Sequence, residues 1–295
     1  MTAQPARIYQ SQFLNSRFQQ SLAHWNRQRL VPRFPEDDNP ATRADDEKMR
    51  RLERAFLEEL RADVLAEAAA APASAADFVA WFEDLRTTGP GQGDPLFPWL
   101  AEAASHADIC WFLEQEAAGE AGFDDLVALT QVKLPVRAKL ELARNYWDEM
   151  GRGNIRGMHG PMLGRLVDAL DLTPAIETTV WESLALANAM TAMATNRAYA
   201  WHSVGALGVI ELTAPGRSAC TAAALRRIGL NGKQRQYFDL HAVLDVKHSA
   251  DWNREALLPL VEEDPRRARA IAEGALIRLE AGARCFARYR QMLAP

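Results

Sequence analysis

Two histidines and an aspartate near position 245 share one face of a predicted helix. His241, Asp245 and His248 are spaced at i, i+4 and i+7, and the 3.6-residue turn of an α-helix brings these positions to the same side. Imidazole and carboxylate groups on one face make a ligand set that suits iron, manganese or zinc. Apolar neighbours such as Leu240 and Leu244 favour a face directed into the protein over a polar surface stripe.

A glutamate and a histidine lie ten residues apart in a second segment. Glu149 ends an amphipathic stretch, and Gly151 and Gly153 precede His159. On an unbroken helix the two side chains would point apart, but the glycines allow an unwound turn that directs both inward. The alternative is that Gly151 caps the helix and leaves His159 in a loop.

A third carboxylate, Glu211, follows an uninterrupted apolar run at 204–210. Burying it is unfavourable unless it binds something; the alternative is an exposed position at a helix end. Two ferrous ions would nearly balance the three carboxylates of these segments, which makes joint burial tolerable. The candidate metal ligands are therefore Glu149, His159, Glu211, His241, Asp245 and His248.

These segments resemble the haem-oxygenase-like diiron oxidase and oxygenase superfamily, broadly described as iron-containing redox enzymes. The resemblance is carried by DEMGRGNIRGMH, by Glu211 and by HAVLDVKH, and it covers roughly residues 80–290. It implies an all-α, haem-oxygenase-like helical bundle that holds two iron ions, with manganese as an alternative metal. The implied activity is O₂-dependent oxidation of a small organic substrate of amine, amino-acid or fatty-acid type, with an external electron donor where turnover needs one.

Several alternatives stay open. A ferritin-like site expects Glu-x-x-His on two helices, but Arg156 stands three residues before His159. Glu116 and Glu120 lie one helical turn apart. Either could be an additional metal ligand or a hydrogen-bond acceptor for a ligand histidine; the alternative is that both belong to a solvated acidic face. The functional alternatives are a metal-free hydrolase or cofactor-biosynthesis enzyme of the same fold, and a non-catalytic iron-binding protein.

The elements that must position these residues are predicted to be helices throughout. Alanine, leucine, arginine and glutamate dominate after residue 45, all of them good helix formers, and the alternation typical of strands is scarce. We expect an N-terminal arm and connector at 1–50 and a metal-binding domain at 51–295. The predicted helices span 45–70, 75–86, 98–118, 123–131, 135–150, 160–170, 174–212 with a break, 217–229, 233–248, 251–261 and 264–293.

Composition narrows the class of protein and its partners. The 295 residues are 48% hydrophobic and 25% charged with a formal net charge of -5, which is ordinary for a globular protein and argues against nucleic acid as a partner. No apolar stretch suits a signal peptide or a membrane span. Three separate cysteines favour reduced thiols and a cytoplasmic location. A homodimer is compatible with the sequence, because symmetric dimers are common.

Overall fold

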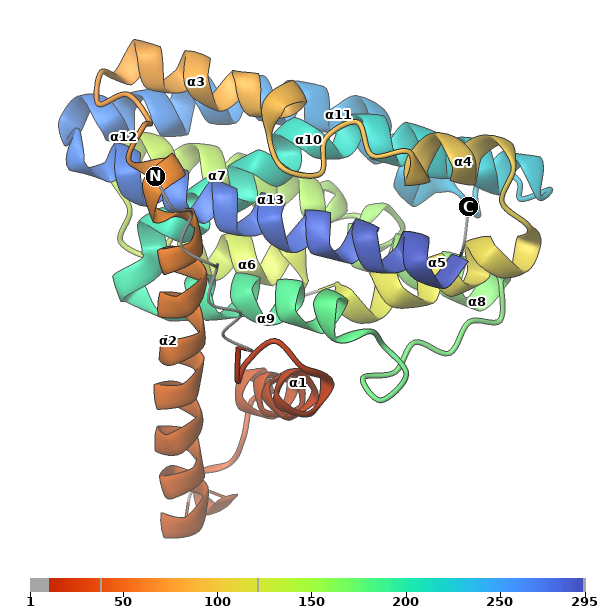
Figure 1. The fold of residues 1–295 in the computed structure, drawn as a ribbon, viewed down its shortest axis with the longest axis horizontal. Helices are drawn as coiled ribbons and strands as arrows, with labels where there is room; N and C mark the ends of the chain where they lie inside the picture. The colour runs from red at the N-terminus through yellow and green to blue at the C-terminus, as the bar shows by residue number, and fades with distance from the viewer. Residues whose placement is uncertain (1–10, 38, 121, 294–295) are drawn as a thin grey trace, which may run out of the picture.

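The computed structural model of the chain consists of helices and their connections (Figure 1). It describes residues 11–37, 39–120 and 122–293, and within these ranges no strand forms; one isolated antiparallel bridge joins Met150 and Met158. The predicted all-α bundle is therefore confirmed. The helices are α1 (Ser16–Leu30), α2 (Pro40–Ala68), α3 (Ala75–Thr88), α4 (Leu96–Glu102), α5 (His106–Gly119), α6 (Phe123–Thr130), α7 (Val136–Glu149), α8 (His159–Ala169), α9 (Trp181–Thr195), α10 (Ala200–Arg227), α11 (Gln236–Trp252), α12 (Leu258–Glu263) and α13 (Arg266–Leu293).

The long helices α10, α11 and α13 run roughly along the longest axis of the molecule, and α2 crosses them steeply (Figure 1). Helices α10 and α13 approach so closely that only glycine fits where they meet. A Cβ added at Gly205 would lie 1.9 Å from the carbonyl oxygen of Ile271, and one at Gly274 would lie 1.9 Å from that of His202. The backbone of α10 is thereby fixed against α13 at the centre of the bundle.

A buried carboxylate stabilises the same crossing. Glu273 on α13 is 2% exposed and accepts hydrogen bonds from His202 Nε2 at 3.0 Å and from Arg61 Nε at 2.8 Å. Burial alone would raise the pKa of Glu273, but the hydrogen bonds and charges of His202 and Arg61 lower it to about 2. The histidine therefore serves to join α10 to α13, and Arg61 adds α2 to the same contact.

Replacing Glu273 with glutamine is expected to lower the free energy of unfolding at pH 7 by ~2 kcal/mol. A carboxyl group whose pKa is depressed on folding stabilises the protein above its unfolded pKa and loses that effect as the pH falls. The difference between wild type and Glu273→Gln should accordingly shrink as the pH drops from about 4.5 towards 2. Urea unfolding at several pH values measures this, with the exposed Glu262→Gln as the control. A difference that does not change with pH would contradict the prediction.

Part of the sequence expected as an arm is helical. Helix α1 packs on α9, where Asn26 Nδ2 donates to Asn188 Oδ1 at 3.0 Å and Asn188 Nδ2 donates to Gln19 Oε1 at 2.8 Å. Residues 1–10 and residue 38 of the expected arm lie outside the described residues. These buried amide contacts attach the described N-terminal segment to the bundle.

Some helix boundaries differ from the prediction. The break expected within 174–212 is confirmed and lies at Asn196, whose side chain accepts a hydrogen bond from the amide of Ala198 and so starts a new turn. Helix α10 continues through Pro215, which has no N–H to donate to the carbonyl of Glu211 one turn earlier. The predicted 98–118 helix is divided into α4 and α5. No helix within the described ranges is long and apolar enough to cross a membrane.

Candidate metal centre

The six candidate ligands converge in two groups of three. Within each group the ligand atoms all lie within 4.8 Å of one another. Five of the six side chains are at most 5% exposed, and the sixth, His241, is half-buried. The first group is Glu149, His159 and His241, from α7, α8 and α11; the second is Glu211, Asp245 and His248, from α10 and α11.

An unwound segment brings Glu149 and His159 together. Helix α7 ends at Glu149 and α8 begins at His159, and two short 3-10 turns fill the space between them. Gly151 has a positive φ of 59°, and a Cβ there would lie 2.3 Å from the carbonyl carbon of Gly157, so glycine is required for this tight return. The unwound turn is therefore confirmed. Gly151 also follows the end of α7, as the alternative expected, but His159 begins α8 instead of lying in a loop, and its Nδ1 lies 2.7 Å from Glu149 Oε2.

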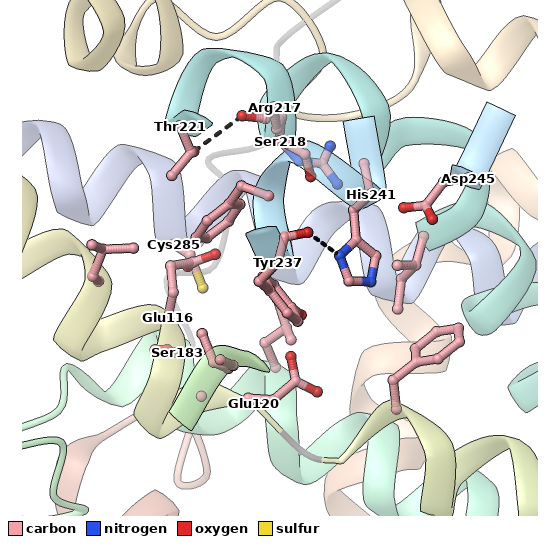
Figure 2. Close-up of a pocket in the computed structure, with 18 of the residues that line it drawn as sticks. Glu116, Glu120, Ser183, Arg217, Ser218, Thr221, Tyr237, His241, Asp245 and Cys285 are labelled. Carbon is pink, nitrogen blue, oxygen red and sulfur yellow. Dashed lines mark hydrogen bonds between the residues drawn. The ribbon is translucent and has the colours of Figure 1, made fainter. Parts of the chain in front are cut away.

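Two side chains of the first group lie close together without a hydrogen bond between them. His159 Nδ1 is buried and makes no hydrogen bond despite its short distance to Glu149. Two neighbouring ligands with metal bonds of about 2 Å lie ~3 Å apart, which matches this separation. His241 donates from Nδ1 to the backbone carbonyl of Tyr237 at 2.7 Å (Figure 2), and its Nε2 is thereby left to act as the ligand atom.

The second group is oriented by two residues that the sequence did not point out. His248 Nδ1 lies 3.5 Å from Glu211 Oε2, while its Nε2 donates to Asp148 Oδ2 at 3.0 Å. Asn145 Nδ2 donates to Glu211 Oε1 at 2.6 Å. A carboxylate behind a histidine fixes the ring and its tautomer for a metal on the other nitrogen. In the sequence, Asp148 is distinguished only by being adjacent to Glu149, and Asn145 only by standing one helical turn before Glu149.

The electrostatics of the centre favour a bound cation. Burial, with Glu211 among the neighbouring charges, raises the pKa of Glu149 to about 8. Burial, followed by the charges of Glu211 and Glu149, raises that of Asp245. Burial and the nearby His248 lower the pKa of His159 to about 4, which keeps that imidazole neutral and able to bind metal. Burial alone would lower the pKa of His248, but the hydrogen bonds and charges of Glu211 and Asp148 raise it to about 9. Carboxylates crowded with imidazoles are oxygen and nitrogen donors of the kind that ferrous iron takes.

Asp148 provides a direct test of this arrangement. Asp148→Asn is expected to weaken Fe(II) binding by about 10–100-fold, because the hydrogen bond that orients His248 loses its charge. Competition with a chromophoric chelator under anaerobic conditions measures the affinity. Arg152→Gln is the matched control, since Arg152 is the other partner of Asp148 and is itself exposed. Equal losses in the two variants would contradict an orienting role for Asp148.

A cavity of about 190 Å³ borders both groups, with Glu149, Glu211, His241 and Asp245 in its wall. It extends away from them between α5, α10, α11 and α13 (Figure 2). The cavity gives a small molecule a place directly beside the candidate ligands.

Glu116 and Glu120 line the same cavity (Figure 2). Glu116 accepts a hydrogen bond from Tyr289 Oη at 2.9 Å, and Glu120 accepts one from the amide of Gly122 at 3.2 Å. Burial, followed by the charges of Glu149 and Glu116, raises the pKa of Glu120 to about 7. His248 donates a hydrogen bond to Asp148 and not to Glu116 or Glu120. An additional-ligand role for Glu116 or Glu120 stays a prediction.

The chain matches a known protein family. The family model for iron-containing redox enzymes matches residues 110–283, which is more than half of the chain and includes all six candidate ligands. A search of the curated proteins gave no match. The match includes both groups and the segments that position them, and the chain therefore belongs to the family of iron-containing redox enzymes.

Proposed function

We propose that the protein is a non-haem diiron oxidase or oxygenase that activates O₂ to oxidise a small organic substrate. The observation that carries the proposal is the pair of buried three-residue groups, each with its ligand atoms within 4.8 Å, beside one cavity. Iron bound by carboxylate and imidazole ligands with open positions supplies O₂ chemistry.

The chain's own residues hold and orient this centre. Glu149, His159 and His241 would bind one ion, and Glu211, Asp245 and His248 would bind the other. The Tyr237 carbonyl fixes the ring of His241, and Asp148 fixes that of His248. Apolar cavity walls keep bulk water away from the bound substrate.

The alternatives explain fewer of the observations. A metal-free hydrolase would leave Glu149, Glu211 and Asp245 buried together without the cation that their proximity demands. A non-catalytic iron-binding protein has no use for a cavity with ligand residues in its wall. Both alternatives make different predictions for one experiment.

The test is anaerobic titration of the metal-free, full-length protein with Fe(II), followed by Mössbauer spectroscopy and measurement of O₂ uptake. We expect about two irons per chain and uptake of O₂ that depends on iron. His241→Ala should reduce both, and His106→Ala, which alters an exposed histidine at the start of α5, should reduce neither. Failure of the wild-type protein to bind iron would reject the proposal, and two irons that do not react with O₂ would favour the iron-binding alternative.

A further inference from the structure

Two arginines line the cavity, and neither forms an ion pair with a carboxylate of the described residues. They are Arg217 on α10 and Arg278 on α13. Arg217 Nη2 donates to Thr213 Oγ1 at 3.1 Å, and Arg278 Nε is buried without a hydrogen-bond partner. Among residues 11–37, 39–120 and 122–293, no carboxylate oxygen lies within 4.0 Å of a nitrogen of either guanidinium.

Carboxylates lie near the two guanidiniums but do not form ion pairs with them. The charges of Glu116 and Asp245 act on Arg217, and those of Glu116 and Glu120 act on Arg278. Burial, and then the charge of Arg278, lowers the pKa of Arg217 to about 9, and burial lowers that of Arg278 as well. The carboxylate of Glu116 is engaged by Tyr289 Oη and lies beyond ion-pair distance of both guanidiniums. Two guanidiniums near each other in a cavity wall form a site for an anion, which they can bind by charge-assisted hydrogen bonds.

The remaining walls and the volume define the rest of the ligand. The lining also contains apolar side chains, with Phe112, Leu113 and Leu186 among them. A cavity of about 150 Å³ holds a benzene molecule, so 190 Å³ suits a ligand of roughly 7–9 non-hydrogen atoms.

We propose that Arg278 and Arg217 bind the carboxylate of a small carboxylic acid substrate, whose apolar body extends towards Glu149 and His241. This inference rests on the proposed function for the fate of the substrate, but the anion site itself does not require iron. The carboxylate is held by the arginines rather than by the candidate metal ligands, so the opposite end of the molecule is presented for oxidation. The arginines are accordingly substrate-binding residues.

The experiment measures binding of hexanoate by isothermal titration calorimetry, to the full-length protein both metal-free and loaded with Fe(II) under anaerobic conditions. Hexan-1-ol and hexylamine have nearly the same hydrocarbon chain as hexanoate but lack its negative charge. We expect hexanoate to bind at least about tenfold more tightly than either, with or without iron. Arg278→Gln should weaken hexanoate binding at least about tenfold and leave hexan-1-ol binding unchanged, because only the charged contact is lost.

Arg284→Gln is the matched control, since Arg284 is on the same helix but pairs with Asp63 outside the cavity; it should leave hexanoate binding unchanged. If Arg278→Gln does not fold, Arg217→Gln and the comparison of the three probes on wild type provide the test. No hexanoate binding, equal binding of hexanoate and hexan-1-ol, or unchanged binding in Arg278→Gln would each overturn the inference. Iron loading and O₂ uptake are measured separately. Failure of the diiron proposal would therefore leave Arg278-dependent hexanoate binding in place. Failure of hexanoate binding would likewise leave iron loading and O₂ uptake in place.

Discussion

Asp245→Ala is expected to leave one iron per chain instead of two and to lower O₂-dependent turnover by more than ~100-fold. Asp245 belongs only to the group with Glu211 and His248. The other group retains all three of its ligands, so its metal should remain while the two-metal centre is lost. Metal analysis after anaerobic loading, combined with O₂ uptake, measures both effects.

The control for this variant is Asp239→Ala on the same helix, α11. Asp239 pairs with Arg235 and does not belong to either group, so this variant should still bind two irons. Loss of both irons from Asp245→Ala alone would contradict the division of the centre into two groups. Retention of both irons would remove Asp245 from the ligand set.

Gly274→Ala is expected to lower the free energy of unfolding by ~3 kcal/mol or more, because it forces α13 away from α10. The new Cβ would lie 1.9 Å from the carbonyl oxygen of His202. That atom belongs to a helix backbone and cannot rotate away as the end of a side chain can. Urea unfolding monitored by circular dichroism measures the loss, and iron binding should fall with it because α10 also carries Glu211.

Gly216→Ala on α10 is the matched control for Gly274→Ala. A Cβ at Gly216 would meet nothing within 4 Å, and alanine is favoured over glycine inside a helix by up to ~1 kcal/mol. This variant should therefore be as stable as wild type or slightly more stable. Similar stability of Gly274→Ala and Gly216→Ala would show that the two helices can separate without loss.

The part of the centre that depends on local geometry could be predicted from the sequence. His241, Asp245 and His248 lie on one face because the helical repeat alone places them there. Glu149 and His159 required one further inference, that the glycines between them unwind the chain, and the structure has that unwound segment. In both segments the residues that determine the arrangement lie within about ten positions of one another in the sequence.

The residues that the sequence did not indicate depend on contacts between distant segments. Asp148 acts on His248, which is 100 positions away, and a lone aspartate at a helix end looks like an ordinary surface residue. Arg278 lies in an amphipathic helix rich in arginine, where only the packed structure distinguishes a cavity position from an exposed one. The gap expected between the predicted helices 174–212 and 217–229 was wrong, since α10 continues through Pro215.

The bridge between Met150 and Met158 has a consequence for how distant relatives would be recognised. It fixes the two ends of the segment that joins Glu149 to His159, while residues 152–156 between those ends are exposed. Insertions or deletions there would leave both ligands where they are, whereas a single insertion within HAVLDVKH would rotate His248 off its face. A search for homologues should therefore allow a variable gap after the glutamate and require fixed spacing in the HxxxDxxH segment.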